Sequence, residues 1–191
     1  MRAEEPILEC ATAAKWAAWL QRNHARSTGA WLRLAKKGAE RQTLSYAEAL
    51  DIALCQGWID ARSQSEGDHY WLKRFTPRSS RSIWSKINCD KAMKLLRAGR
   101  MQPAGLAEID RAKSDGRWDA AYDGARTSTV PADLQAALEA EPRAADFFAT
   151  LDSTNRYAVL FRTQTAKKPE TRAKRVAQFV AMLARGEKLH P

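Results

Sequence analysis

Cations, hydroxyl groups and an aromatic ring are concentrated in one stretch, Phe75-Thr76-Pro77-Arg78-Ser79-Ser80-Arg81-Ser82-Ile83-Trp84-Ser85-Lys86-Ile87-Asn88. Arginine offers a planar fork of donors that suits phosphate and carboxylate. Serine and threonine add hydroxyl donors, and the free amides at a helix start favour anions. We therefore expect a site for an anionic small molecule or polyanion, built from Trp58, Asp60, Arg74, Thr76, Arg78, Arg81, Ser82, Trp84 and Asn88.

The same residues also suit structural roles. The serines can cap the following helix, Pro77 can shape the turn, and Trp84 can fill the core. The tryptophans Trp58, Trp71 and Trp84 can either form a stacking surface for nucleic-acid bases or pack inside the protein. Both interpretations of this stretch stay open at the level of sequence.

Asp60 is the residue that could support catalysis. A carboxylate near the arginines could act as a general base or orient Arg74 or Arg78, whereas a buried Asp–Arg pair is the structural alternative. The chain has no phosphate-binding loop, no GxGxxG pattern and no GxSxG elbow. We assign no catalytic residue, favour binding over catalysis, and keep an undescribed enzyme using Asp60 as an alternative.

The cysteines and histidines do not indicate a metal site or a cofactor. Cys10, Cys55 and Cys89 are far apart and odd in number, and no CxxC, HExxH or HxH spacing occurs. We expect reduced thiols, no metal and no cofactor.

The net charge of +10 is unevenly distributed along the chain. Residues 60–100 carry +6 and residues 156–191 carry +7, while residues 101–155 between them carry −5. On the last helix, Lys168, Arg172 and Arg175 share one face and form a second basic face. That face is either solvated, docked on the acidic segment, or used for nucleic acid or another polyanion, which makes nucleic-acid binding an alternative function.

No targeting or membrane-spanning segment is apparent. The start, Met1–Pro6, is acidic and is not followed by an apolar segment, which argues against a signal peptide. No run approaches the roughly 18 apolar residues of a membrane helix. We expect a cytoplasmic protein without membrane insertion, and the oligomeric state is not determined by the sequence.

Periodicity and capping signals predict a helix-dominated α+β protein. Ser45 and Glu48 form a capping box before one helix. Strands are expected over 30–36, 58–62 and 70–76, a turn over 63–68, and helices over 12–25, 46–56, 85–98, 103–114, 131–140, 142–151, 154–166 and 169–186. This predicts a small mixed sheet covered by helices in an N-terminal part, residues 1–126, and an all-helical C-terminal part, residues 127–191, that can pack as one unit with it.

Several ordered phrases resemble a known family. They include Leu44-Ser45-Tyr46-Ala47-Glu48-Ala49, Gly57-Trp58-Ile59-Asp60, Arg74-Phe75-Thr76-Pro77-Arg78, Ser82-Ile83-Trp84-Ser85-Lys86-Ile87-Asn88 and Ala166-Lys167-Lys168-Pro169-Glu170-Thr171-Arg172. The chain resembles the YdeI/OmpD-associated family, often labelled bacteriocin-protection proteins, over nearly its whole length. The resemblance implies a cytoplasmic bacterial protein linked to tolerance of antimicrobial peptides or stress, and it carries no catalytic residues.

Overall fold

The computed structural model describes residues 5–191. Residues 1–4, the start of the segment considered for targeting, lie outside this range. Contacts divide the chain into two compact units: one runs to Trp84 and resumes over Asn88–Ala120, and the other joins Ser85–Ile87 to Ala121–Pro191. The predicted division after residue 126 stays a prediction.

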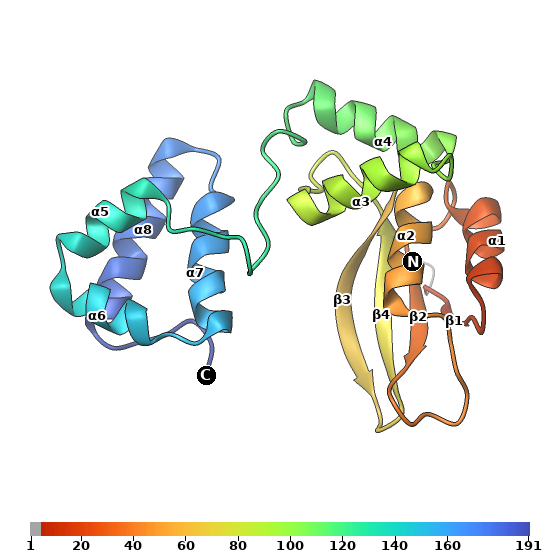
Figure 1. Ribbon diagram of the computed structural model, residues 1–191, viewed down its shortest axis with the longest axis horizontal. Coiled ribbons are helices and arrows are strands. Elements are labelled where there is room, and N and C mark those ends of the chain that lie inside the picture. The colour runs from red at the N-terminus through yellow and green to blue at the C-terminus, as the bar shows by residue number, and fades with distance from the viewer. Residues whose placement is uncertain (1–4) are drawn as a thin grey trace. The chain divides into compact units, whose positions relative to one another are not determined.

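The first unit contains a four-stranded mixed sheet, with the strands in the order β1-β2-β4-β3 (Figure 1). The β1–β2 pair is parallel, and the other two pairs are antiparallel. In chain order, the elements up to residue 114 are β1 (Ile7–Glu9), α1 (Ala13–Asn23), β2 (Ala30–Ala35), α2 (Tyr46–Cys55), β3 (Trp58–Glu66), β4 (Tyr70–Pro77), α3 (Lys86–Arg97) and α4 (Pro103–Ser114).

Helices α1 and α2 pack on one face of the sheet because they present apolar stripes to it. Trp16 of α1 is fully buried, lies 5.5 Å from the ring of Phe75 on β4, and donates its Nε1 hydrogen to the Ala49 carbonyl of α2 at 3.1 Å. Strand β2 alternates between buried and half-buried residues, as a sheet with one covered face requires. Aromatic packing of α1 on β4, joined to α2 by this hydrogen bond, therefore forms the centre of this core.

Gly57 joins α2 to β3 and helps to place the candidate site. Its φ of 71° lies in the left-handed region, and a Cβ there would come within 2.8 Å of the Ala104 carbonyl of α4. The Gly57 carbonyl accepts the amide hydrogen of Arg78 at 2.9 Å. This contact holds the residue that follows β4 against the end of α2.

The second unit is built from four helices, α5 (Ala132–Glu139), α6 (Pro142–Thr150), α7 (Ser153–Gln164) and α8 (Pro169–Ala184). Pro142 and Pro169 occupy first-turn positions, and Asp152 caps α7 by accepting the amide of Asn155 at 2.8 Å. The buried core of this unit consists of Leu134, Leu138, Ala144, Phe148, Val159, Leu160, Val176, Phe179 and Leu183.

The predicted fold class is confirmed: a small mixed sheet with helices lies in the N-terminal part, and the C-terminal part is helical. Two local expectations differ from the structure. Residues 63–66, expected in a turn, continue β3 beyond an irregular register between Asp60 and Ser63. Strand β1 was not expected at all.

Candidate functional site

The segment singled out by its composition forms the connection between β4 and α3. Within it, Ser79 and Ser82 close a turn on each other: the Ser79 amide donates to Ser82 Oγ at 2.9 Å, and the Ser82 amide donates to the Ser79 carbonyl at 3.0 Å. Ser79 Oγ also accepts the amide of Arg81 at 3.2 Å. We call residues 79–84 the serine loop.

Arg78 supports one end of the serine loop from inside the protein. Its side chain is only 5% exposed, and its guanidinium carbon lies 3.5 Å from the centroid of the Trp84 ring, a close cation–π contact. Its Nη1 donates to the Ile83 carbonyl at 3.2 Å. Trp84 in turn packs on Trp118 at 4.8 Å between centroids.

Arg117, which follows α4, supports the middle of the serine loop. It is 5% exposed, and its Nη1 donates to the carbonyls of Ser82 at 2.9 Å and Ser79 at 3.3 Å. The Nε of Arg117 donates to Asp115 Oδ1 at 2.8 Å, and this bond orients the guanidinium. Sequence reasoning did not select Arg117 as a site residue, and the only local signal for it is the aspartate two residues before it in Asp115-Gly116-Arg117-Trp118.

These inward carbonyls determine where the loop's amides point. In a planar trans peptide the N–H lies opposite the carbonyl of the preceding residue. Because the carbonyls of Ser79 and Ser82 turn toward Arg117, the amides of Ser80 and Ile83 turn away from it, and neither finds an acceptor within residues 5–191. The amides between them, of Arg81 and Ser82, are used inside the loop, so Ser80 and Ile83 provide two separate backbone donors for an external acceptor.

The exposed part of the loop adds a cation and hydroxyl groups. Arg81 is exposed, as are Ser79 and Ser80, whereas Ser82 is half-buried. The structure therefore brings Arg81, Ser82 and Trp84 together in the serine loop, with Arg81 exposed on it and the Arg78 guanidinium buried beneath it. Asn88 follows in the first turn of α3.

Arg74 and Asp60 have partners other than each other. Arg74 forms an ion pair with Glu5, and its Nε donates to Glu5 Oε2 at 2.7 Å, which raises the pKa of Arg74. Asp60 accepts from Lys73 at 2.8 Å and from the Tyr46 hydroxyl at 2.9 Å. Asp60 therefore pairs with a lysine and a tyrosine, where the structural alternative was a buried Asp–Arg pair.

Trp58 and Thr76, the remaining predicted residues of the first unit, lie in the core and in the sheet. Trp58 is 1% exposed, donates from Nε1 to the His24 carbonyl at 3.2 Å, and lies edge-on to Trp16 at 6.5 Å. Thr76 is half-buried in β4, opposite Ile59 of β3. The buried Trp58 face is thus part of the core packing rather than an open surface for stacked bases.

The second basic face lies at the start of α8. Arg172 pairs with Asp133 of α5 at 2.6 Å and donates from Nη1 to the Thr163 carbonyl at 3.1 Å. Arg175 donates to the Arg162 carbonyl at 2.5 Å, and Lys168 is exposed at the N-cap. Two of its three cations therefore complement the carboxyl end of α7, where cations are favoured by the helix dipole.

Three further features bear on what the chain can do. Across residues 5–191 no group of three or more His, Cys, Asp and Glu side chains could hold a metal ion. The cysteines are all buried, and burial raises the pKa of Cys89 to about 11. Within the same range, none of the helices combines the length and apolar composition required to cross a bilayer.

Comparison with known proteins identifies two families along the chain. A family model described as a domain of unknown function (DUF8412) matches residues 8–108, more than half of the chain. The chain belongs to this family. A second model, described as bacteriocin-protection, YdeI or OmpD-associated, matches residues 127–186, which confirms the resemblance predicted from the sequence over those residues. Neither the curated proteins nor the solved structures contain a match.

Proposed function

We propose that this protein is a cytoplasmic bacterial binding protein, linked to tolerance of bacteriocins or stress, that takes an anionic ligand on its serine loop. The link to tolerance comes from the family matched by residues 127–186. The ligand class comes from the loop itself. The proposal assigns no catalytic step, and Asp60, the candidate base, is paired with Lys73 and Tyr46.

The observation that carries the proposal is the arrangement of the loop over Arg117. That buried guanidinium holds two loop carbonyls inward, so the amides of Ser80 and Ile83 are left for an external acceptor. Arg81 places a full positive charge at the same exposed loop. An anion bound there would receive charge-assisted hydrogen bonds, which are stronger than neutral ones.

The test uses inorganic phosphate as the probe and amide NMR shifts as the readout. Phosphate is expected to shift the amides of Ser80 and Ile83, and Arg81→Gln is expected to weaken binding about tenfold, the loss of one charge-assisted contact. Arg22→Gln, which removes an exposed arginine in the last turn of α1, serves as the charge-matched control. Shifts absent from the serine loop, or equal affinities in the two variants, would refute the proposal.

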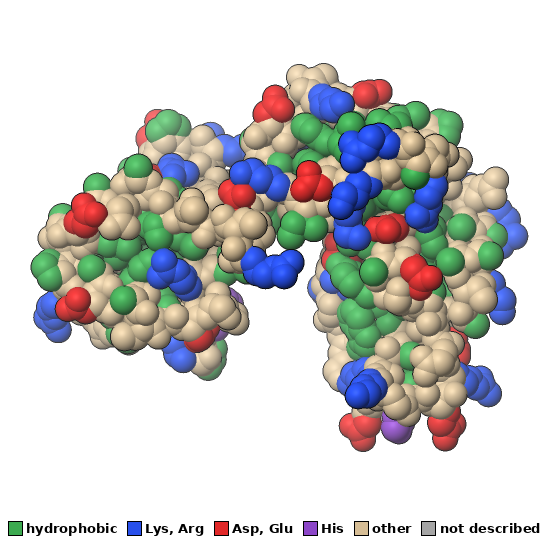
Figure 2. All heavy atoms as spheres, in the orientation of Figure 1, with side chains coloured by type: hydrophobic (Ala, Val, Ile, Leu, Met, Phe, Trp, Pro, Cys, Tyr) green, Lys and Arg blue, Asp and Glu red, His purple; other side chains and the backbone are tan. Residues whose placement is uncertain are grey.

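A second candidate is nucleic-acid binding by the basic surface of the first unit. Lys94 and Arg97 of α3 and Arg100 beyond it are exposed and belong to no ion pair within residues 5–191. Figure 2 shows several Lys and Arg side chains gathered over α3 and α4. Binding to DNA or RNA that weakens steeply with salt would support this candidate, and no binding at low salt would remove it.

A further inference from the structure

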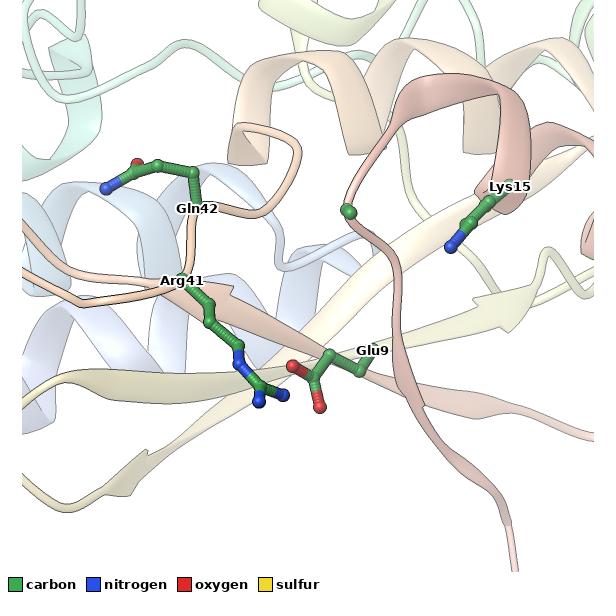
Figure 3. A pocket seen from close by; sticks show the side chains of 5 residues that line it. Glu9, Lys15, Arg41 and Gln42 are labelled. Carbon is green, nitrogen blue, oxygen red and sulfur yellow. The ribbon is translucent and has the colours of Figure 1, made fainter.

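The second unit contains an apolar groove between α5 and α8. It has a volume of about 440 Å³ and is lined by Asp133, Ala137, Pro169, Arg172, Ala173, Val176 and Ala177, of which five are apolar. A recess beside β1 in the first unit is different, since Figure 3 shows that the carboxylate of Glu9 and the guanidinium of Arg41 face one another there. That recess holds its own counter-charges, whereas the groove in the second unit presents apolar side chains to solvent.

Helix α8 has two apolar faces, and one of them is exposed. Val176 and Leu183 belong to the buried core of the unit. Pro169, Ala173 and Ala177 are spaced four residues apart, so they form one ridge along the helix, and all three are exposed. Since the outward face of a surface helix is usually polar, an exposed apolar ridge that lines a groove is a candidate binding surface.

The dimensions of the groove suit a helix. Its α8 wall runs from Pro169 to Ala177, about two turns and about 12 Å at the rise of an α-helix. An amphipathic helix contacts a groove through side chains at i, i+3, i+4 and i+7, which span a similar length. The small side chains of Ala137, Ala173 and Ala177 allow a second helix to approach closely and leave room for one bulky apolar side chain.

The rim of the groove is positively charged. Residues 167–178 carry five Lys and Arg side chains and one carboxylate, that of Glu170, a net charge of +4, and the pairing of Arg172 with Asp133 of α5 leaves +3. Lys168 and Lys174 are exposed and form no ion pair within residues 5–191. An apolar centre with a charged rim is the usual composition of a protein interface, and the sign of this rim favours a partner that carries carboxylates.

We propose that the groove binds an amphipathic helix of a partner protein, with acidic side chains on either side of one leucine or phenylalanine. The apolar side chain inserts between α5 and α8 over Val176, and the carboxylates face Lys168 and Lys174. Nucleic acid, the alternative considered for this basic face, would engage the lysines through its phosphates and leave the alanines uncovered. The groove shares no residue with the serine loop, so this proposal does not depend on anion binding there.

The experiment adds two synthetic amphipathic peptides to the full chain and follows amide NMR shifts. Both peptides carry leucine along one face, and the polar face is glutamate in one and lysine in the other. The glutamate peptide is expected to shift the amides of Ala137, Ala173 and Ala177. The lysine peptide is expected to bind at least tenfold more weakly, because the basic rim repels it.

A pair of variants places the binding in the groove. Ala177→Glu puts a bulky charge into the groove and is expected to weaken binding of the glutamate peptide at least tenfold. Gln178→Glu adds the same charge at the next exposed position, outside the lining of the groove, and is expected to weaken binding less than about threefold. The comparison of the two peptides on wild type does not depend on how the variants fold.

Three results would overturn the proposal. The first is a glutamate peptide that leaves the amides of Ala137, Ala173 and Ala177 unshifted or binds no more tightly than the lysine peptide. The second is equal affinity of the two variants for the glutamate peptide. The third is duplex DNA that shifts Lys168 and Lys174 while the glutamate peptide does not, which would assign this face to nucleic acid. None of these results bears on phosphate binding at residues 79–84.

Discussion

Replacing Arg117 with methionine removes the guanidinium beneath the serine loop while keeping most of the side chain's apolar volume. The Ser82 carbonyl then loses its 2.9 Å donor, whereas the Ser79 carbonyl keeps the Ser82 amide at 3.0 Å. One orphaned buried carbonyl costs about 1–3 kcal/mol. The pair with Asp115, whose side chain is 39% exposed, adds about 0–1 kcal/mol. Methionine also removes the desolvation cost of burying the Arg117 guanidinium, which offsets part of this loss. We therefore expect the unfolding free energy to fall by about 1–3 kcal/mol.

Urea unfolding followed by tryptophan fluorescence measures this loss, because all seven tryptophans belong to the first unit. The matched control is Arg81→Met, which removes an exposed arginine of the same loop and is expected to change stability by less than about 0.5 kcal/mol. Phosphate binding is expected to fall in both variants. Wild-type stability together with wild-type phosphate binding in Arg117→Met would refute the argument that this guanidinium shapes the loop.

Three further outcomes follow from named contacts. The hydrogen bond from Arg172 lowers the pKa of Asp133, so the stabilising effect of Asp133 is present above its unfolded pKa and disappears as the pH falls through the lower folded value. Circular dichroism should therefore show wild type losing more stability below about pH 4 than Arg172→Met, and parallel losses would contradict this. Because burial raises the pKa of Cys89 to about 11, a thiol reagent at pH 8 should label it slowly in the folded protein and rapidly in urea; rapid labelling of the folded protein would contradict its burial. Asp60→Asn should cost about 1–3 kcal/mol, since Lys73 is only 12% exposed and loses its carboxylate partner. Adding Lys73→Met should restore part of that stability in urea unfolding, and strictly additive costs would argue against the pair.

Signals from residues close together in the sequence predicted most of the fold. Contacts between residues far apart in the sequence account for the errors. The Ser45–Glu48 capping box is present with both of its hydrogen bonds, because a cap involves residues only three apart. Strand β1 has three residues and pairs with β2 more than 20 residues later, so it has no periodicity of its own. Residues 63–66 are polar because they lie on an edge strand beyond the Asp60/Ser63 irregularity, and polarity alone was interpreted as a turn.

In the candidate site, too, the residues close together in the sequence were predicted and the distant ones were not. The grouping of Arg78, Ser82 and Trp84 was predictable because they are close in sequence and lie in one connection. The contribution of Arg117 was not, since it reaches the loop from 35 residues downstream, and neither was the pairing of Arg74 with Glu5 across 69 residues. Composition therefore located the loop, but only the tertiary contacts show which arginine is exposed and which ones support the backbone.

The two family matches separate the proposed binding site from the source of the tolerance link. The serine loop and its supports, Arg78 and Arg117, lie in the first unit, and the model for the domain of unknown function ends at residue 108. The bacteriocin-protection match covers residues 127–186 of the second unit. A tolerance phenotype that survives Arg81→Gln but is lost on disrupting the core of the second unit would therefore assign tolerance to the second unit alone. Loss in Arg81→Gln with wild-type folding would instead make anion binding by the first unit a requirement for it.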